Sequence, residues 1–156
     1  NKFENLEEVN SLFELIKKTN SVSIHIRRGD YVTAESARNI LGPLDAEYYY
    51  RCVDYINNRV NNPHYFLFSD DPNWVFSNFK IHHPVTIIDN NSIDECYEDL
   101  RLMKQCKHHI IANSTFSWWG AWLSPIQDKI VLAPKNWHAD KNRKTHDLIP
   151  TSWTRI

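Results

Sequence analysis

The chain has 156 residues, the size of one ordinary domain, and its 42% hydrophobic and 24% charged residues indicate a globular protein rather than a disordered one. Its 18 Lys and Arg against 19 Asp and Glu give a formal net charge of −1, which argues against a general polyanion binder, so we expect no nucleic-acid partner. No apolar run is long enough to span a bilayer, and the N-terminus lacks the layout of a signal peptide. We expect residues 1–156 to form a single domain that, because it does not begin with Met, is a fragment of a longer protein.

Glycine and cysteine counts exclude further classes of site. The three glycines cannot build the dinucleotide fingerprint G-x-G-x-x-G or the phosphate loop G-x-x-x-x-G-K-[ST]. The three cysteines are an odd number and contain no C-x-x-C pair. A disulfide framework or a zinc ribbon is therefore not expected, and a reducing compartment is the simpler interpretation.

Helices and strands are expected to alternate from the start of the chain. Apolar residues at helical spacing predict a helix over 6–18, and the short apolar run 21–26 predicts a strand. The polar stretch 27–43 is expected to be a loop long enough to carry function. Asp45 is a good N-cap for a helix that runs to about Val60.

The same alternation continues through the second half of the chain. Its expected elements are a strand at 65–68, a helix from Pro72 to Phe79, a strand at 85–88, a helix capped by Ser92 and running to Met103, a strand at 109–112, a helix at 116–123 and a strand at 129–133. The tail, 135–156, shows no convincing period. Short, nearly unbroken apolar strands that alternate with helices predict an α/β fold: a Rossmann-like doubly wound parallel sheet of five strands, covered on both faces.

Polar segments follow four of these strands. Ligands of doubly wound sheets bind beyond the carboxyl ends of the strands. This rule directs attention to residues 27–30, 69–71, 89–91 and 113–117.

The most specific signal among these segments is a pair of adjacent arginines, Arg27 and Arg28, at a point where Gly29 lets the backbone turn. Arginine binds phosphate oxygens bidentately, and a fixed cation lowers the barrier to the departure of a diphosphate leaving group. A structural pair that bridges to acidic residues at the sheet edge remains the alternative. Arg28, Gly29 and Asp30 also spell the tripeptide that integrins recognise, but an adhesive loop needs an exposed tip and this one follows a buried strand.

A second polar run follows a predicted strand and opens a helix: Asn113, Ser114, Thr115, Phe116 and Ser117. Backbone N–H groups at a helix start, helped by hydroxyl groups, bind phosphate without a glycine-rich loop. The first three residues are also ordinary N-cap types. Capping and anion binding use the same groups, so both interpretations stand.

Three carboxylates are candidates for chemistry or recognition. Asp99 could accept the two N–H donors of guanine, or it could be a solvated helix charge. Asp30 and Glu35 follow the arginine pair and could take a proton from an attacking hydroxyl, or they could be ordinary loop charges. The eight histidines do not show the spacing of a helical zinc site, and no Asp-x-Asp follows a strand. We therefore expect no metal, and we expect no cofactor either.

Four motifs occur together in one order: His25-x-Arg27-Arg28-Gly29-Asp30-Tyr31-Val32, Ser69-Asp70-Asp71, Asp99-Leu100-x-Leu102-Met103, and Ile111-Ala112-Asn113-Ser114-Thr115-Phe116-Ser117-Trp118-Trp119. Together they resemble the α-1,2-fucosyltransferases, glycosyltransferase family 11, which share motifs with α-1,6- and protein O-fucosyltransferases. The resemblance covers the chain from Val22 to about Pro150. It implies the carboxyl-terminal, donor-binding domain of a two-domain GT-B enzyme that uses GDP-β-L-fucose, inverts the anomeric centre and needs no metal.

The resemblance also assigns expected roles by position. Arg27 would hold the β-phosphate with support from Arg28, and the turn from Ser114 to Ser117 would meet the pyrophosphate. His25 and Asp99 would meet the guanine. Glu35 falls where the related α-1,6 enzymes place a proposed base.

The partners implied are GDP-fucose, a β-galactoside acceptor that takes fucose on O2 of a terminal galactose, and an amino-terminal acceptor domain outside this chain. The lack of an anchor favours a bacterial cytoplasmic enzyme, peripheral to the inner membrane at most; a eukaryotic enzyme would lie in the Golgi lumen. Two other functions remain open. One is a non-catalytic sugar-nucleotide or glycan-binding module, and the other is an adhesive ligand that uses the Arg-Gly-Asp tripeptide.

Overall fold

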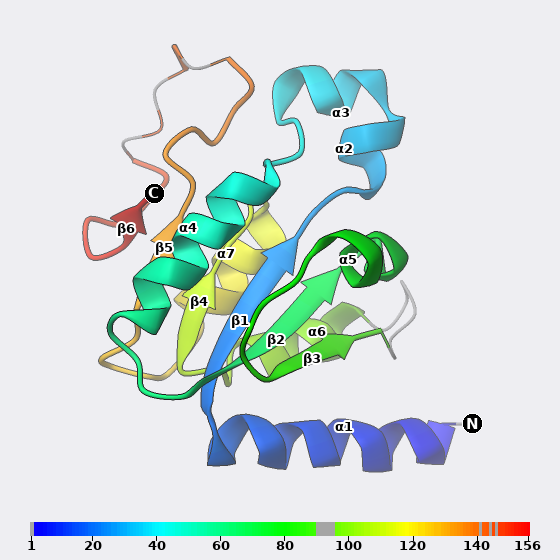
Figure 1. Ribbon diagram of the computed structural model, residues 1–156. Coiled ribbons are helices and arrows are strands. Elements are labelled where there is room, and N and C mark those ends of the chain that lie inside the picture. Colours follow the sequence, from blue (N-terminus) through cyan, green and yellow to red (C-terminus); the bar gives the residue numbers. More distant parts are fainter. Residues whose placement is uncertain (1, 90–95, 141, 144, 146) are drawn as a thin grey trace.

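A computed structural model describes residues 2–89, 96–140, 142–143, 145 and 147–156. Its described strands are β1 (Asn20–Ile26), β2 (Pro63–Ser69), β3 (Val85–Ile88), β4 (His108–Ile110), β5 (Val131–Ala133) and β6 (Thr154–Arg155). They form one sheet in the order β3-β2-β1-β4-β5-β6, and every neighbouring pair is parallel (Figure 1). The predicted parallel α/β sheet is therefore confirmed, and its strand order is that of dinucleotide-binding doubly wound sheets.

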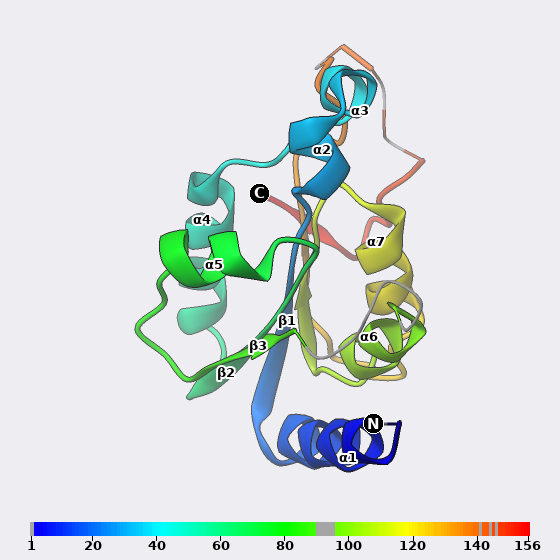
Figure 2. The same ribbon diagram turned by 90° about the vertical axis from the view of Figure 1, so that its right-hand side faces the viewer.

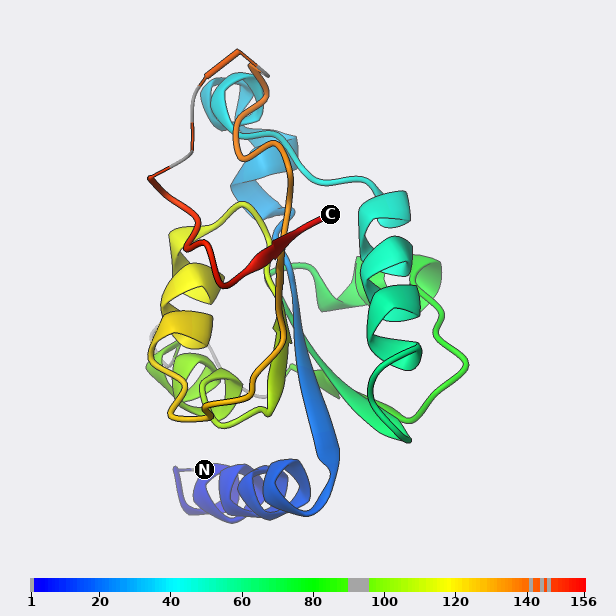
Figure 3. The ribbon, with the colours of Figure 1, turned by 90° about the vertical axis from the view of Figure 1, so that its left-hand side faces the viewer.

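Helices cover both faces of the sheet. They are α1 (Lys2–Lys18), α2 (Gly29–Thr33), α3 (Glu35–Ile40), α4 (Ala46–Asn57), α5 (Pro72–Asn78), α6 (Cys96–Met103) and α7 (Thr115–Trp122). α4 and α5 lie on one face, and α1, α6 and α7 lie on the other (Figures 2 and 3). Strand β2 is buried on both faces of the sheet, which explains why its sequence is apolar without alternation. Tyr65 and Leu67 pack into the core beside α4, whereas Phe66 and Phe68 pack into the core beside α1 and α6.

Two predicted helix starts are confirmed by their caps. Asp45 accepts a hydrogen bond from the backbone N–H of Tyr48 at 2.8 Å. Asp71 caps α5 in the same way by accepting from the N–H of Trp74 at 3.1 Å, with Pro72 at the first helical position. Ser92, the predicted cap of the next helix, lies outside the described residues.

The stretch from Arg27 to Pro43 is not the continuous loop that we predicted. It contains α2 and α3, each only one or two turns long. Buried Tyr31 anchors α2, because its hydroxyl donates to the backbone oxygen of Asn113 at 3.0 Å. Helices of this length are too short to show a hydrophobic period, so the sequence pattern missed them.

The tail also contributes an element that the sequence did not predict. Thr154 pairs with Leu132, and Arg155 pairs with Ala133, so β6 becomes a sixth strand at the edge of the sheet. Trp153 and Ile149 pack into the core beside α7 and hold the tail in place. No described helix is both long and apolar enough to cross a membrane.

Candidate active site

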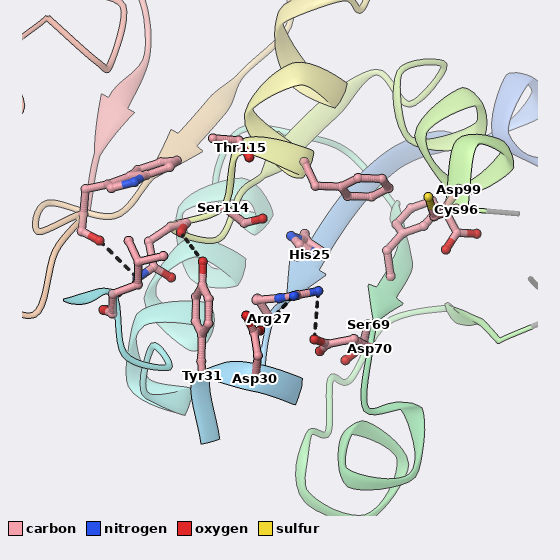
Figure 4. A pocket seen from close by; sticks show the side chains of 15 residues that line it. His25, Arg27, Asp30, Tyr31, Ser69, Asp70, Cys96, Asp99, Ser114 and Thr115 are labelled. Atoms are coloured by element: carbon pink, nitrogen blue, oxygen red, sulfur yellow. Dashed lines mark hydrogen bonds and ion pairs between the residues drawn. The ribbon is translucent and has the colours of Figure 1, made fainter. Parts of the chain in front are cut away.

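A cleft of about 590 Å³ lies at the carboxyl ends of β1, β2 and β4 (Figure 4). This is the edge of the sheet where the sequence placed the ligand site. The cleft is lined by His25, Arg27, Asp30, Tyr31, Leu41, Phe68, Ser69, Asp70, Cys96, Asp99, Asn113, Ser114, Thr115, Phe116 and Trp137. Eight of the predicted site residues are among them.

Arg27 lies between two carboxylates in this cleft. Its Nη2 is 2.8 Å from Asp30 Oδ1, and its Nη1 is 3.0 Å from Asp70 Oδ2. Arg27 is the only Lys or Arg among the described residues that line the cleft. All three side chains are partly exposed, so oxygen atoms of an anionic ligand can compete with the carboxylates for the guanidinium.

The side chain of Arg28 turns away from the cleft. Its guanidinium lies 3.8 Å from the centroid of the Trp74 ring, and its Nε is 3.4 Å from Asp71 Oδ2. Both partners belong to the start of α5, on the other face of the sheet from α7. The structure therefore separates the two arginines, and direct support of a phosphate by Arg28 stays a prediction.

His25 is a buried member of the cleft lining. Its side chain is 5% exposed, and its Nδ1 has no hydrogen-bond partner among the described residues. Burial, followed by the nearby charge of Arg27, lowers the pKa of His25 to about 3. The imidazole is therefore neutral at pH 7 and can offer one donor and one acceptor to a ligand. A buried ring nitrogen without a partner inside a cleft is a place where a ligand could complete the hydrogen bond.

The residues at the start of α7 have two different roles: some line the cleft, and one makes hydrogen bonds within the protein. Ser114, Thr115 and Phe116 line the cleft, and Ser114 makes no side-chain capping bond to the helix. Ser117 does not line it. The Ser117 hydroxyl accepts from the N–H of Ala112 and donates to the backbone oxygen of Ser114, at 3.2 and 3.3 Å.

Asn113 lines the cleft, and its side-chain nitrogen contacts the backbone, whereas its buried Oδ1 has no hydrogen-bond partner among the described residues. Its Nδ2 lies within hydrogen-bond distance of three backbone oxygens, those of Leu41, Gly42 and Trp137, at 3.0, 3.0 and 3.1 Å. These contacts tie the loop after α3 and the segment after β5 to the end of β4. Asn113 thus shapes one wall of the cleft through its neighbours.

The two remaining predicted carboxylates lie in different places. Asp99, on α6, lines the cleft beside Cys96, and Figure 4 shows both at the opposite end of the cleft from Tyr31. Glu35 begins α3, is exposed, and is not among the described lining residues. Among the described residues, no three His, Cys, Asp or Glu side chains are arranged to hold a metal ion.

Several lining residues were not predicted as site residues. They are Tyr31, Leu41, Phe68, Ser69, Asp70, Cys96 and Trp137. Ser69 and Asp70 belong to one of the four segments at strand ends, so the topology rule pointed at them. Leu41 and Trp137 come from loops that carry no chemical motif, and only the folded chain brings them to the cleft.

The family model of glycosyl transferase family 11 matches residues 3–156. An α-1,2-colitosyltransferase of Escherichia coli is 40% identical over 153 residues, which cover 96% of this chain and 52% of the relative. The O-antigen biosynthesis glycosyltransferase WbnK of Escherichia coli is 37% identical over 142 residues, covering 91% of this chain and 46% of the relative. The chain thus spans about half the length of these relatives. Among solved structures, the fucosyltransferase NodZ from Bradyrhizobium shares the fold with a TM-score of 0.54 at 14% identity, over 78% of this chain and 42% of NodZ.

Proposed function

The chain belongs to glycosyltransferase family 11, and on that basis we propose that it is the donor-binding part of an inverting, metal-independent α-1,2-fucosyltransferase of GT-B architecture. Its donor would be GDP-β-L-fucose, and its acceptor would be O2 of a galactose in a β-galactoside. The observation that carries the proposal is the cleft itself: it combines a partly exposed arginine, a buried histidine with an unpaired nitrogen and the start of a helix. A diphosphate would fit the arginine and the positive end of the helix dipole, and a nucleotide base would fit the histidine.

In the proposed reaction the acceptor oxygen attacks C1 of fucose while the bond from C1 to the β-phosphate oxygen breaks and GDP leaves. Arg27 would stabilise the negative charge that develops on the β-phosphate. Arg27 is paired with both Asp30 and Asp70, and we propose that the phosphate replaces at least part of the pair with Asp30.

A carboxylate would take the proton of the attacking hydroxyl. Asp30 lines the cleft next to Arg27, whereas Glu35 lies outside it, so we favour Asp30 as the base. A phosphate that draws Arg27 away from Asp30 would leave that carboxylate free to accept a proton. We further propose that the acceptor is held mainly by sequence outside these 156 residues, since the matched relatives are about twice as long.

Colitose transfer is a second candidate function. It is favoured by the 40% identity, across 96% of this chain, to a relative that is an α-1,2-colitosyltransferase. Parallel titrations with GDP-fucose and GDP-colitose would separate the two donors.

We expect the chain to bind GDP equally well with and without excess EDTA. Arg27 and the start of α7 supply positive potential for a pyrophosphate, so a bridging divalent cation is not needed. Isothermal titration calorimetry of GDP in the two buffers measures this directly, with ADP as the control nucleotide. A requirement for Mg²⁺ or Mn²⁺ would contradict metal independence, and no GDP binding in either buffer would contradict the proposed function.

Replacing Asp99 by asparagine is expected to cost about 1–2 kcal/mol of GDP affinity and to reduce the preference for GDP over ADP. The amide would place an N–H donor against the N–H donors of guanine. Calorimetry with GDP and ADP gives both affinities. Glu98→Gln, on the same helix but outside the cleft lining, is the matched control. An unchanged ratio of GDP to ADP affinity in Asp99→Asn would remove guanine recognition from this residue.

A further inference from the structure

Asp70 touches the arginine motif with both of its carboxylate oxygens. Oδ1 accepts a hydrogen bond from the backbone N–H of Arg28 at 2.8 Å. Oδ2 lies 3.0 Å from Nη1 of Arg27 (Figure 4). A single side chain from the end of β2 thus holds both the backbone that leaves β1 and the guanidinium that enters the cleft.

The same carboxylate also lies close to the glycine in the motif. A Cβ atom added at Gly29 would lie 2.5 Å from Oδ2 of Asp70 and 3.1 Å from its Cγ. Gly29 does not adopt the left-handed region, so its own backbone conformation does not require glycine. A side chain at this position would instead force the Asp70 carboxylate to move.

Asp70 is itself held in place by the sheet. Ile26 at the end of β1 is in register with Ser69 at the end of β2. The Ser69 hydroxyl donates to the backbone oxygen of Ile26 at 2.8 Å and accepts from the N–H of Asp71 at 3.0 Å. The turn that carries Asp70 is therefore fastened to the strand that carries Arg27.

We propose that Asp70 is a positioning residue that fixes the Arg27 guanidinium and the backbone at Arg28 and Gly29 for a diphosphate ligand. This inference rests on the proposed function, because the diphosphate is the ligand proposed for the cleft. Asp30 provides the contrast: its carboxylate also pairs with Arg27, but it lies on the short helix α2 and its side chain is about half exposed.

The two ways in which Asp70 could act on GDP binding, through its charge or by positioning Arg27, predict opposite changes in GDP affinity when Asp70 is neutralised. Asp70 is an anion beside the place of another anion, so if only its charge mattered, neutralising it would tighten GDP binding. If Asp70 positions Arg27, the loss of the ion pair would leave the guanidinium in several orientations, and binding would weaken. The sign of the change in affinity therefore decides between the two.

The test compares Asp70→Asn with Asp30→Asn in calorimetric titrations of GDP and guanosine. We expect Asp70→Asn to weaken GDP binding about tenfold, the scale of one hydrogen bond to a charged group, and to leave guanosine binding unchanged. Asp30→Asn removes the same charge from the same guanidinium and is expected to bind GDP at least as tightly as the wild type. GDP binding by Asp70→Asn that matches or exceeds the wild type would overturn the proposal, and so would an equal loss for GDP and guanosine.

A double-mutant cycle with Gly29→Ala gives an independent check. The new methyl group would displace the Asp70 carboxylate, so Gly29→Ala is expected to weaken GDP binding as much as Asp70→Ala does. The double variant should be no weaker than either single variant, because both changes remove one interaction. Additive losses would contradict the inference.

Amide hydrogen exchange tests the positioning without any nucleotide. In Asp70→Ala the Arg28 amide loses its acceptor, so its exchange is expected to accelerate while the amides of β1 stay protected. An unchanged Arg28 exchange rate would overturn the inference even if GDP binds. If the wild type binds no GDP but Arg28 exchange accelerates, the proposed function fails, whereas the placement of the motif by Asp70 stands.

Discussion

Arg27→Lys is expected to weaken GDP binding by about 1.5–3 kcal/mol, the range for a hydrogen bond to a charged group. Lysine keeps the positive charge but loses the planar fork, which can contact phosphate oxygens and a carboxylate at the same time. The loss should be large because Arg27 is the only Lys or Arg among the described cleft-lining residues, and its guanidinium is paired with Asp30 and Asp70. Calorimetric titration of GDP, with thermal unfolding to verify the fold, measures it.

Arg28→Lys is the matched control for this experiment. The Arg28 guanidinium lies over Trp74 and beside Asp71, outside the cleft lining, so the same substitution one residue along is expected to change GDP affinity much less. Equal losses for the two variants would mean that Arg28 moves into the cleft when nucleotide binds. An unchanged GDP affinity in a folded Arg27→Lys variant would remove Arg27 from the phosphate site.

Acidification from pH 6.5 to 4.5 is expected to lower the free energy of unfolding by about 2 kcal/mol for each of two buried histidines. Burial lowers the pKa of both His25 and His109 to about 3, with smaller contributions from Arg27 at the first and Lys129 at the second. The unfolded chain takes up protons near the ordinary pKa of 6.5, whereas the folded chain does not. This part of the stability is therefore fully present above pH 6.5 and is lost as the pH falls toward 3.

His109→Gln isolates one of these two contributions without touching the cleft. The His109 ring is fully buried, and its Nδ1 lies 2.8 Å from the Ser23 hydroxyl, a bond that a glutamine side chain can imitate without titrating. Urea unfolding at pH 6.5 and 4.5 should show an acid-induced loss that is about 2 kcal/mol smaller in this variant than in the wild type. His82→Gln, which replaces an exposed histidine, should keep the full loss. Equal losses in the wild type and His109→Gln would contradict the assignment.

Local patterns in the sequence were enough to identify most of the secondary structure. Strands β2 and β5 contain short unbroken apolar runs, and Asp45 places its carboxylate where a helix needs an acceptor. Both signals come from residues within a few positions of each other. The topology rule then located the cleft, because the carboxyl ends of parallel strands share one edge.

The sequence by itself thus determined the fold class, the edge of the sheet that carries the cleft, and several groups in it, including Arg27 and His25. Only the tertiary structure decided that Arg27 enters the cleft while Arg28 stacks on Trp74, since neighbouring side chains that leave a strand point to opposite sides. It also brought Asp70 to a motif 42 residues earlier in the chain. That contact depends on the register between β1 and β2, and register is set by how whole strands pack together, which no short stretch of sequence encodes.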